Sequence, residues 1–439
     1  MRVLLVSPTA LDSRGRPIKQ RRVHLPALTL PMLAAVTPPG THLRLCCETA
    51  EEIPFDEPWD LVGLTGMGSG IVRAWQIADE FKQRGRTVVI GGIAATLGDP
   101  AWSLAHADSV VLGEAEELWP EVLRDAAAGR LQSVYRMRRE PPVDQLPVPR
   151  YDLLNPVVYG RWRPVQATRG CPFTCTFCSI TAFFHQRYRK RPVDPVVRDV
   201  REAKRWGTRY IAFIDDNIGV DWDYCARLWE ALIPERIIWM SQCSLHIADR
   251  PDMLELASRS GCRMLSFGIE STSADSLAGI DKAWNRPARY REAVRRIRAY
   301  GIDVSTEMMI GLDGDDRSVF QRTYDFVMDN AISVPRVHIL TPIPGTPLFD
   351  QLKDEGRILN EGFDRYTGGH VVFRPTHLDA AELEAGYWKL YERLFSWPAI
   401  VQRVAPNPAS LSGYMRALVV GVNLHYRRHV HHRISPGIV

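Results

Sequence analysis

The stretch Thr168-Arg-Gly-Cys-Pro-Phe-Thr-Cys-Thr-Phe-Cys-Ser179 decides the fold, because it places three cysteines close together in a short loop. Cys171, Cys175 and Cys178 are separated by three and then two residues. A loop this short lets three thiolates converge on one inorganic centre. Iron–sulfur cubes are normally held by four thiolates. Three thiolates therefore leave one iron open, and an open metal position is where a substrate or cofactor binds.

The stretch 163–168 predicts a short buried strand that leads into this loop. A strand followed by Cys-x3-Cys-x2-Cys, with the aromatic Phe177 just before the last cysteine, resembles the signature of radical S-adenosylmethionine (SAM) enzymes. The resemblance implies a 4Fe–4S cluster on the three cysteines and SAM on its open iron. In that family one electron from the cluster cleaves SAM to methionine and a 5′-deoxyadenosyl radical, which abstracts a substrate hydrogen atom. The alternatives are a structural zinc loop, which would need a fourth ligand, and a non-catalytic cluster.

Composition limits the class of protein. A chain of 439 residues should hold two or more domains, and 45% apolar and 24% charged residues are ordinary for a soluble globular protein. The net charge of +4 is too small to imply a nucleic-acid partner. Eight cysteines without pairing symmetry predict a reducing cytoplasm. No run approaches the roughly 18 apolar residues that span a membrane, and the N-terminus is typical of a first strand rather than a signal peptide.

Residues 1–135 alternate between predicted strands and helices, which is typical of a parallel sheet with helices on both faces. The predicted strands are 2–6, 42–47, 59–67, 87–93 and 109–113. In such sheets ligands lie over the carboxyl ends of the strands. Glycines gather at those ends, where they let a bulky ligand approach the backbone.

This order of elements resembles the cobalamin-binding domain that precedes the barrel in many radical SAM enzymes. The residues that carry the resemblance, and that it implies for cobalamin binding, are Thr65, Gly66, Gly91, Gly92, Gly113 and Glu114. The sequence lacks the Asp-x-His-x-x-Gly string with which some cobalamin domains ligate cobalt, so the resemblance implies cobalamin without a lower histidine ligand. The alternative is a plain Rossmann-like domain whose glycines only make turns.

The proline-rich, charged stretch 136–162 predicts an extended linker. Residues 163–350 contain six predicted strand–helix repeats, which indicates a partial (β/α)6 barrel, open on one side. In barrels of this type the chemistry lies at the carboxyl ends of the strands. The radical SAM family has the same six-repeat barrel, so the repeat count and the cysteine loop point to one fold class. The predicted fold is therefore α/β: a Rossmann-like domain, a partial barrel and a mostly helical C-terminal segment.

Polar residues follow several predicted barrel strands, and the resemblance implies that they bind SAM together with Phe177. They are Asp215, Asp216 and Asn217 after the second strand, Glu270 and Ser271 after the fourth, Glu307 in the fifth and Thr341 after the sixth. A carboxylate suits the methionine ammonium because it accepts its hydrogen bonds. The family's usual Gly-Gly-Glu is absent at the second strand. Each residue could instead be a structural polar group at a strand end. The longer pattern is similar to the branch that contains hopanoid C-2 methylase.

Residues 351–439 include an amphipathic helix at 380–395 and are the predicted cover of the open barrel. The end of the chain, 418–433, is apolar and then basic, which has two interpretations. It is either a packed helix with a solvated tail or a contact with an anionic membrane surface.

Three function classes remain open on the sequence alone. The first is a radical SAM enzyme that uses cobalamin to methylate an unactivated carbon of a small or lipid-like metabolite. The second is a radical SAM cyclase, rearrangement or carbon–sulfur enzyme whose front domain binds no cobalamin. The third is a non-catalytic iron–sulfur redox or sensing protein. Either enzyme would need an electron donor such as flavodoxin or ferredoxin.

Overall fold

The computed structural model describes residues 1–439 except 26, 207, 361, 407–411 and 437–439. The described chain forms two compact units. The first unit comprises residues 1–166 together with 189–209, and the second comprises residues 167–188 and the described chain from 210 onward. Residues 189–209 pack with the first unit, although the sequence assigned them to the barrel.

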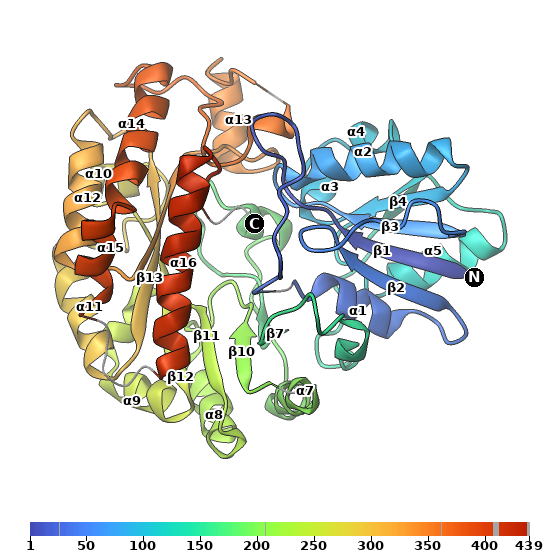
Figure 1. Cartoon of the computed structure of the whole chain (residues 1–439), viewed down its shortest axis with the longest axis horizontal. Helices are drawn as coiled ribbons and strands as arrows, with labels where there is room; N and C mark the ends of the chain where they lie inside the picture. Colours follow the sequence, from blue (N-terminus) through green and yellow to red (C-terminus); the bar gives the residue numbers. More distant parts are fainter. Residues whose placement is uncertain (26, 207, 361, 407–411, 437–439) are drawn as a thin grey trace. The chain divides into compact units, whose positions relative to one another are not determined.

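The first unit is built on a parallel sheet with the strand order β2-β1-β3-β4-β5-β6 and helices on both of its sides (Figure 1). Its strands are β1 (Arg2–Ser7), β2 (His42–Cys47), β3 (Leu61–Thr65), β4 (Thr87–Gly91), β5 (Ser109–Leu112) and β6 (Val134–Arg136). Its helices are α1 (Thr29–Val36), α2 (Gly70–Gln83), α3 (Ile93–Leu97), α4 (Pro100–Leu104) and α5 (Leu118–Ala127). The first unit also contains the 3-10 turn η1 (Tyr151–Leu153) and β7 (Trp162–Val165), which follow β6 in the chain. Its second segment, 189–209, contains β9 (Arg189–Lys190) and α7 (Val193–Arg205).

Alternation between apolar strands and amphipathic helices places the core of this unit. The middle of β1 is fully buried, and α2 turns Ile77 and Phe81 inward at helical spacing. Five strands were predicted here and the structure has six, because β6 was missed. That strand is only three residues long and partly polar, so it carries no clear alternation, and pairing with β5 forms it.

The second unit contains a parallel sheet in which β14, β13, β12, β11 and β10 are neighbours in that order. These strands are β10 (Tyr210–Phe213), β11 (Ile238–Gln242), β12 (Cys262–Glu270), β13 (Asp303–Ile310) and β14 (Val334–Ile339), and β8 (Thr168–Arg169) precedes the cysteine loop. The helices are α6 (Ser179–Phe183), α8 (Trp222–Leu232), α9 (Pro251–Arg259), α10 (Ala274–Ala278), α11 (Tyr290–Ala299), α12 (Val319–Asp329) and α13 (Pro347–Asp354). The 3-10 turns η2 (Ile233–Glu235), η3 (Leu245–Asp249), η4 (Pro287–Arg289) and η5 (Phe363–Arg365) join them. The predicted count of six barrel repeats stays a prediction.

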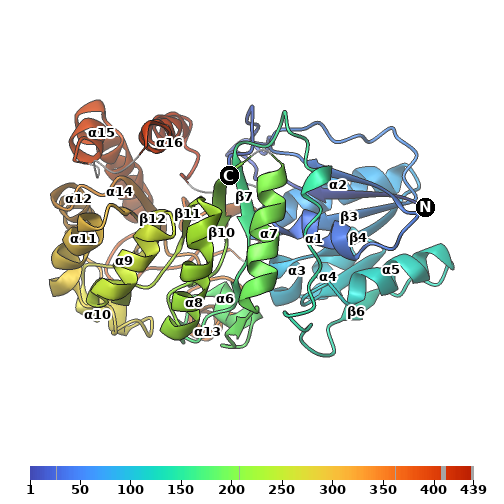
Figure 2. The same cartoon turned by 90° about the horizontal axis from the view of Figure 1, so that it is seen from below.

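Three C-terminal helices complete the second unit and are seen end on in Figure 2: α14 (Ala380–Leu394), α15 (Trp397–Val404) and α16 (Gly413–His431). Their side chains bind backbone atoms of the outer strand β14. The Tyr391 hydroxyl accepts from the Val337 amide at 2.8 Å and donates to its carbonyl at 2.6 Å. The buried Arg403 and Asn423 donate to the carbonyls of Ile332 and Ser333, which directly precede that strand. These contacts satisfy backbone groups that an edge strand leaves unpaired, which agrees with the predicted covering role.

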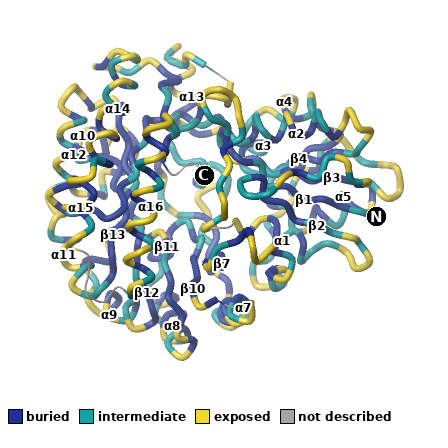
Figure 3. The backbone as a smooth tube through the Cα atoms, in the orientation of Figure 1, coloured by how far each residue is buried: buried dark blue, intermediate teal, exposed yellow. Residues whose placement is uncertain are grey.

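Burial follows this layering in both units (Figure 3). The strands are dark blue, whereas the helices show alternate buried and exposed positions. Among the helices that the structure describes, none is long and apolar enough to cross a membrane.

Candidate active site at the cysteine loop

The three cysteines of the loop lie near one another and none is in a disulfide. Cys175 is buried, with 7% exposure, and Cys171 and Cys178 are half-buried. Burial, with a smaller contribution from the neighbouring Cys178 and Cys171 sulfurs, raises the pKa of Cys175 to about 12. Within the described residues no group of His, Cys, Asp or Glu side chains converges as a single metal ion requires. Three thiolates suit a four-iron cluster with one open iron, whereas a structural zinc site needs a fourth ligand.

Backbone constraints shape the loop. Gly170 has a φ of +79°, and a Cβ atom there would lie 2.0 Å from the Arg187 carbonyl oxygen. Only glycine can occupy such a position without moving the chain. Further along, the Thr176 amide donates to the Ile280 carbonyl and its own carbonyl accepts from the Leu348 amide. Two distant segments of the second unit therefore hold the middle of the loop.

Two aspartates after β10 hold the beginning of the loop. The carboxylate of Asp215 accepts from the Ala167 amide and from both the amide and the hydroxyl of Thr168, at 2.5–3.2 Å. The carboxylate of Asp216 accepts from the Gly170 amide at 3.0 Å. Burial raises the pKa of Asp215 to about 7 and that of Asp216 to about 6. Both side chains already have partners in the loop, so the structure shows them as loop-holding groups.

Asn217 joins the same end of the sheet to the first cysteine. Its side-chain oxygen accepts from the Ser244 amide at 3.0 Å, and Ser244 follows β11. Its side chain also lies within hydrogen-bonding reach of the Cys171 sulfur, where it lowers the pKa of the thiol against the larger, raising effect of burial. An amide beside a cluster sulfur can donate to it, which is one of the ways a protein tunes such a centre.

A buried ion pair lies next to Cys175. The Lys282 ammonium donates to Glu270 at 2.7 Å, and each side chain is only 8% exposed. Glu270 has a φ of +61° at the end of β12, a conformation that is rare for a residue with a side chain. Both groups affect the pKa of the Cys175 thiol. The sequence analysis missed Lys282, which lies in a turn after α10 and carries no periodic or motif signal.

Aromatic side chains surround the ammonium of Lys282. It lies 5.9 Å from the ring centre of Phe177 and 5.1 Å from that of Trp284. Trp284 in turn stacks on Phe173 of the cysteine loop at 4.3 Å and on His246 at 5.2 Å. A cavity of about 280 Å³ borders this stack. Phe177 of the loop thus lies beside the ion pair, and its predicted contact with SAM stays a prediction.

The other predicted SAM residues have separate partners. Glu307 binds Arg336 and His338 of the neighbouring strand β14. Against the raising effect of burial, the Arg336 guanidinium holds the pKa of Glu307 below its usual range. The Thr341 hydroxyl donates to the Ile339 carbonyl at 3.0 Å, and the Ser271 hydroxyl accepts from the Ser273 amide at 3.0 Å. The structure does not bring these three together with the cysteines by any direct contact that it describes.

The carboxyl edge of the first sheet gathers the glycines that the sequence singled out. The Gly66 amide donates to the Gly91 carbonyl, and the Thr96 hydroxyl joins the Gly92 carbonyl to the Gly113 amide. A Cβ atom on Gly92, whose φ is +102°, would lie 2.8 Å from the Thr65 hydroxyl and the Gly66 carbonyl. Added Cβ atoms on Gly66 and Gly113 would meet Ile71 and Met137. Packing within the unit therefore already requires three of the four glycines.

The charged and sulfur-containing side chains near this edge differ in burial and in partners. Glu114 is buried in an ion pair with Arg189 at 2.5 Å. Met67, in the loop after β3, is 76% exposed. His106 pairs with Asp79 at 2.9 Å, away from the carboxyl ends of the strands. The absence of a histidine ligand to cobalt stays a prediction from the missing Asp-x-His-x-x-Gly string.

The remaining five cysteines are buried, and Cys225 and Cys243 contact nearby backbone carbonyls. The Cys225 thiol donates to the Ile218 carbonyl at 2.9 Å, and the Cys243 thiol lies 3.4 Å from the Ser244 carbonyl. Burial raises the pKa of Cys46, Cys225, Cys243 and Cys262. A buried thiol with a raised pKa is an inert core group, so these cysteines have the character of packing residues.

Comparison with known proteins identifies the class. The model of the radical SAM superfamily matches residues 165–327, and a domain of unknown function, DUF4070, matches residues 346–428. The chain is 32% identical to bacteriochlorophyllide d C-12(1)-methyltransferase from Chlorobaculum tepidum, covering 84% of this chain and 82% of that protein. The chain therefore belongs to the radical SAM superfamily and is an enzyme of that family. Membership implies a 4Fe–4S cluster and SAM.

Other relatives and solved structures extend the likeness. Bacteriochlorophyllide d C-8(2)-methyltransferase from the same organism is 28% identical, over 88% of each chain. Hopanoid C-2 methylase from Rhodopseudomonas palustris is 26% identical, over 77% of this chain and 66% of that protein. The solved radical SAM methyltransferase TsrM from Kitasatospora setae has a TM-score of 0.69 at 15% identity and covers 98% of this chain and 99% of its own. The cobalamin-dependent enzyme OxsB also reaches 0.69, at 13% identity, over 98% and 71%. These structures show the fold.

Proposed function

We propose that this chain is a cobalamin-dependent radical SAM methyltransferase that methylates an unactivated carbon of a small or lipid-like metabolite. One observation carries the proposal. A three-cysteine loop held by the ends of barrel strands occurs in a chain that aligns over most of its length with a methyltransferase.

The cluster ligands of this proposal are Cys171, Cys175 and Cys178. Their shared loop and their thiols without disulfides support it. Asp215, Asp216 and Asn217 have a positioning role in this scheme. They fix the strand before the loop, the glycine turn and the surroundings of the first cysteine. Replacement of any of them would move a ligand rather than remove one.

The Glu270–Lys282 pair is the proposed partner of the methionine end of SAM. That end carries an ammonium and a carboxylate, and a buried carboxylate and ammonium complement both by charge-assisted hydrogen bonds. The pair lies beside Cys175, and Phe177 and Trp284 shield it. Ser271, Glu307 and Thr341 stay predicted contacts of the rest of the cofactor.

The front unit is the proposed cobalamin domain, with residues 1–135 as its extent, 136–162 as the linker, 163–350 as the barrel and 351–439 as the cover. Thr65, Gly66, Gly91, Gly92, Gly113 and Glu114 line the edge proposed for the cofactor. The exposed Met67 supplies an apolar contact there that a large ring would bury. The sequence lacks the Asp-x-His-x-x-Gly string, so the proposal includes no histidine ligand to the cobalt from the protein.

When bound, the cluster and cobalamin would supply radical generation and methyl carriage, with SAM as the source of both the radical and the methyl group. The electrons come from an external donor, for which flavodoxin or ferredoxin is proposed. The chain's own part is to hold the cysteine loop rigid and to pair the charges of SAM. The aromatic stack of Phe173, Trp284 and His246 excludes water beside the loop.

The relatives suggest a large, mainly apolar substrate. Their names specify bacteriochlorophyllide d in two cases and a hopanoid in a third. A metabolite of that type is the proposed substrate class, and its identity is left to experiment.

The test is anaerobic purification with hydroxocobalamin supplied, followed by reduction with SAM present. We expect 5′-deoxyadenosine, corrinoid that survives desalting, and a substrate that gains the mass of one CH2 in cell extract. Deoxyadenosine without retained corrinoid would overturn the cobalamin proposal in favour of a cyclase, rearrangement or carbon–sulfur enzyme. Absence of deoxyadenosine from a protein with a full cluster would favour the non-catalytic iron–sulfur protein.

A further inference from the structure

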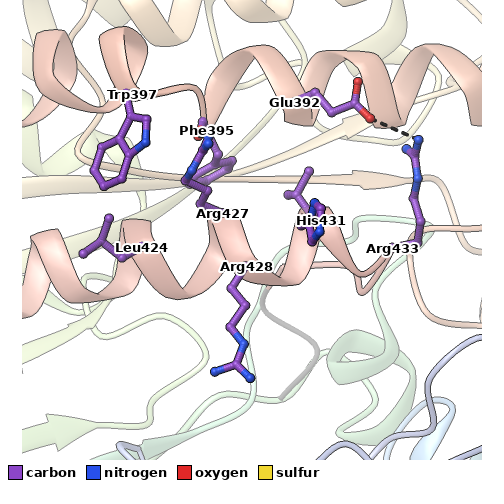
Figure 4. A pocket seen from close by; sticks show the side chains of 9 residues that line it. Glu392, Phe395, Trp397, Leu424, Arg427, Arg428, His431 and Arg433 are labelled. Atoms are coloured by element: carbon purple, nitrogen blue, oxygen red, sulfur yellow. Dashed lines mark hydrogen bonds and ion pairs between the residues drawn. The ribbon is translucent and has the colours of Figure 1, made fainter.

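The two last helices expose apolar side chains that the proposed reaction does not use. Of the eleven large apolar side chains that the described chain exposes, four belong to α15 and α16. They are Trp397 at 56%, Val401 at 62%, Val420 at 39% and Leu424 at 38%. The helices contact each other, and a groove of about 640 Å³ lies between them. Figure 4 shows Trp397 and Leu424 on opposite walls of this groove.

The exposed side of α16 follows helical spacing. Ala417, Val420 and Leu424 form its middle, with Arg416 before them and Arg428 and His431 after them. The opposite side is buried and includes Met415, Val419 and Asn423. An amphipathic helix normally turns its apolar side to the core. This helix does so and also presents a second apolar stripe outward, between cationic ends.

Charge is distributed unevenly along the chain. Residues 393–439 contain six arginines, four histidines and no acidic residue, whereas the preceding residues contain 49 basic and 51 acidic ones. The positive excess of the whole chain therefore lies in this segment. Arg403 is buried and donates to backbone carbonyls. Arg416 and Arg428 are exposed and make no ion pair within the described residues. Figure 4 shows Arg428 pointing away from the groove.

The groove itself contains both apolar and cationic side chains. The Arg427 guanidinium lies 5.3 Å from the ring centre of Trp397 and donates to the Phe395 carbonyl at 2.8 Å. Arg433 pairs with Glu392 at 3.0 Å, at the far end of the groove. Trp397 therefore stands beside a cation at the surface. An indole with one wet and one apolar side is typical of a membrane–water interface.

We infer that the outer side of α15 and α16 docks on a lipid bilayer surface that carries anionic headgroups. Trp397, Val401, Val420 and Leu424 enter the interfacial layer, and Arg416 and Arg428 contact the headgroups. Charge complementarity selects this occupant, because α15 and α16 contain no acidic residue and Glu392 at the end of the groove is paired with Arg433. Such a surface matches anionic headgroups, and the apolar side chains match acyl chains. The inference concerns a surface outside the cysteine site and does not depend on the proposed methyl transfer.

Vesicle co-sedimentation of the anaerobically prepared full chain tests it. Vesicles of phosphatidylcholine alone are compared with vesicles that also contain phosphatidylglycerol, at low and high salt. We expect binding to the anionic vesicles and its weakening by salt. The variant R416Q/R428Q should lose roughly fivefold per arginine, so about 25-fold in partitioning. The variant V401S/V420S/L424S should lose binding even at low salt.

The matched control is R124Q/R259Q, which removes two exposed arginines elsewhere and should bind as the wild type does. Iron content and deoxyadenosine formation should be unchanged in all variants, which shows that each is folded. Equal binding to neutral and anionic vesicles would overturn the inference, as would absence of binding to both. Loss of binding in the control to the same extent would show non-specific charge attraction and would overturn it too. Binding of a reduced acidic electron carrier that R416Q/R428Q abolishes, without vesicle binding, would assign the patch to a protein partner instead.

Discussion

The carboxyl edges of the two parallel sheets are similar in position and different in content. At the second sheet, Asp215 and Asp216 after β10 hold the beginning of the cysteine loop, and the buried Glu270–Lys282 pair lies beside it. At the first sheet the backbone of glycine turns makes much of the edge, and its buried carboxylates Glu48 and Glu114 are paired with Arg73 and Arg189. The same α/β geometry thus supports an edge that does chemistry with side chains and an edge that offers backbone and apolar surface. This difference supports a division between radical generation and the binding of a large carrier.

Loss of a cysteine should have the largest effect. Cys175→Ala removes the most buried thiol of the loop, so we expect cofactor cleavage to fall at least about 1000-fold, since no other described group can replace that ligand. Deoxyadenosine formation by liquid chromatography and mass spectrometry is the measurement. Cys225→Ser and Cys262→Ser are the controls and should retain wild-type iron. If C175A still produced deoxyadenosine, the carboxyl edge of the second sheet would not be the site of SAM cleavage.

The buried ion pair comes next. Lys282→Met leaves the Glu270 carboxylate buried without a counter-ion, which should cost about 3–5 kcal/mol of stability in the second unit. Urea unfolding of the apoprotein measures it. The double variant E270Q/K282M removes both charges and should recover much of the loss. A K282M protein as stable as the wild type would show that the pair is hydrated and not part of the barrel's structure.

Two adjacent glycines sharpen the comparison at the first sheet. Gly92→Ala introduces a side chain at positive φ and overlaps the Thr65 hydroxyl, so we expect a loss of about 2–4 kcal/mol. Gly91→Ala meets only ordinary contacts, the nearest at 3.4 Å, and should change stability by within about 1 kcal/mol. Corrinoid retention by G91A distinguishes a glycine edge that binds cobalamin from glycines that serve packing only. A folded G91A protein that loses corrinoid would show that the cofactor approaches the backbone there, and a protein that retains it would limit the glycines to packing.

The buried His429 should make the stability of the second unit depend on pH. Burial lowers the pKa of His429 in α16 to about 3, so the folded chain keeps this imidazole neutral. The unfolded chain protonates it below about pH 6.5. Its contribution to stability is therefore complete above that pH and is lost as the pH falls. Between pH 7 and 5 the loss should be about 2 kcal/mol.

Urea unfolding at pH 7 and pH 5 is the measurement, with His429→Phe as the comparison. The variant should lose this part of the pH dependence. An equal pH dependence in H429F would assign the acid sensitivity to other groups.

Local pattern predicted much of the fold. The strand 42–47 has the predicted bounds, and β1, β3, β4 and β5 begin and end within two residues of the strands predicted there. Apolar runs between turn residues are short-range signals, and buried parallel strands consist of them. The three-residue β6 was missed because its stability comes from its neighbour rather than from its own residues.

The candidate site was predicted less evenly. The cysteines and Phe177 were recognisable because spacing within one loop is a property of the chain. Lys282 was not, since it meets Glu270 only after a turn brings it back across the end of β12. Asp215 and Asp216 were predicted to bind SAM, which stays a prediction, and in the structure their carboxylates hold the beginning of the loop.

The sequence by itself determined the class of chemistry, because three thiolates in one short loop need no tertiary contact to be recognised as cluster ligands. It also determined the positive, acid-free end of the chain. Tertiary structure decided which charges are buried together, which glycines are required by packing, and which side of α16 remains exposed. Those properties depend on distances between residues far apart in the chain. Periodicity and spacing in the sequence describe only residues that are close together along the chain.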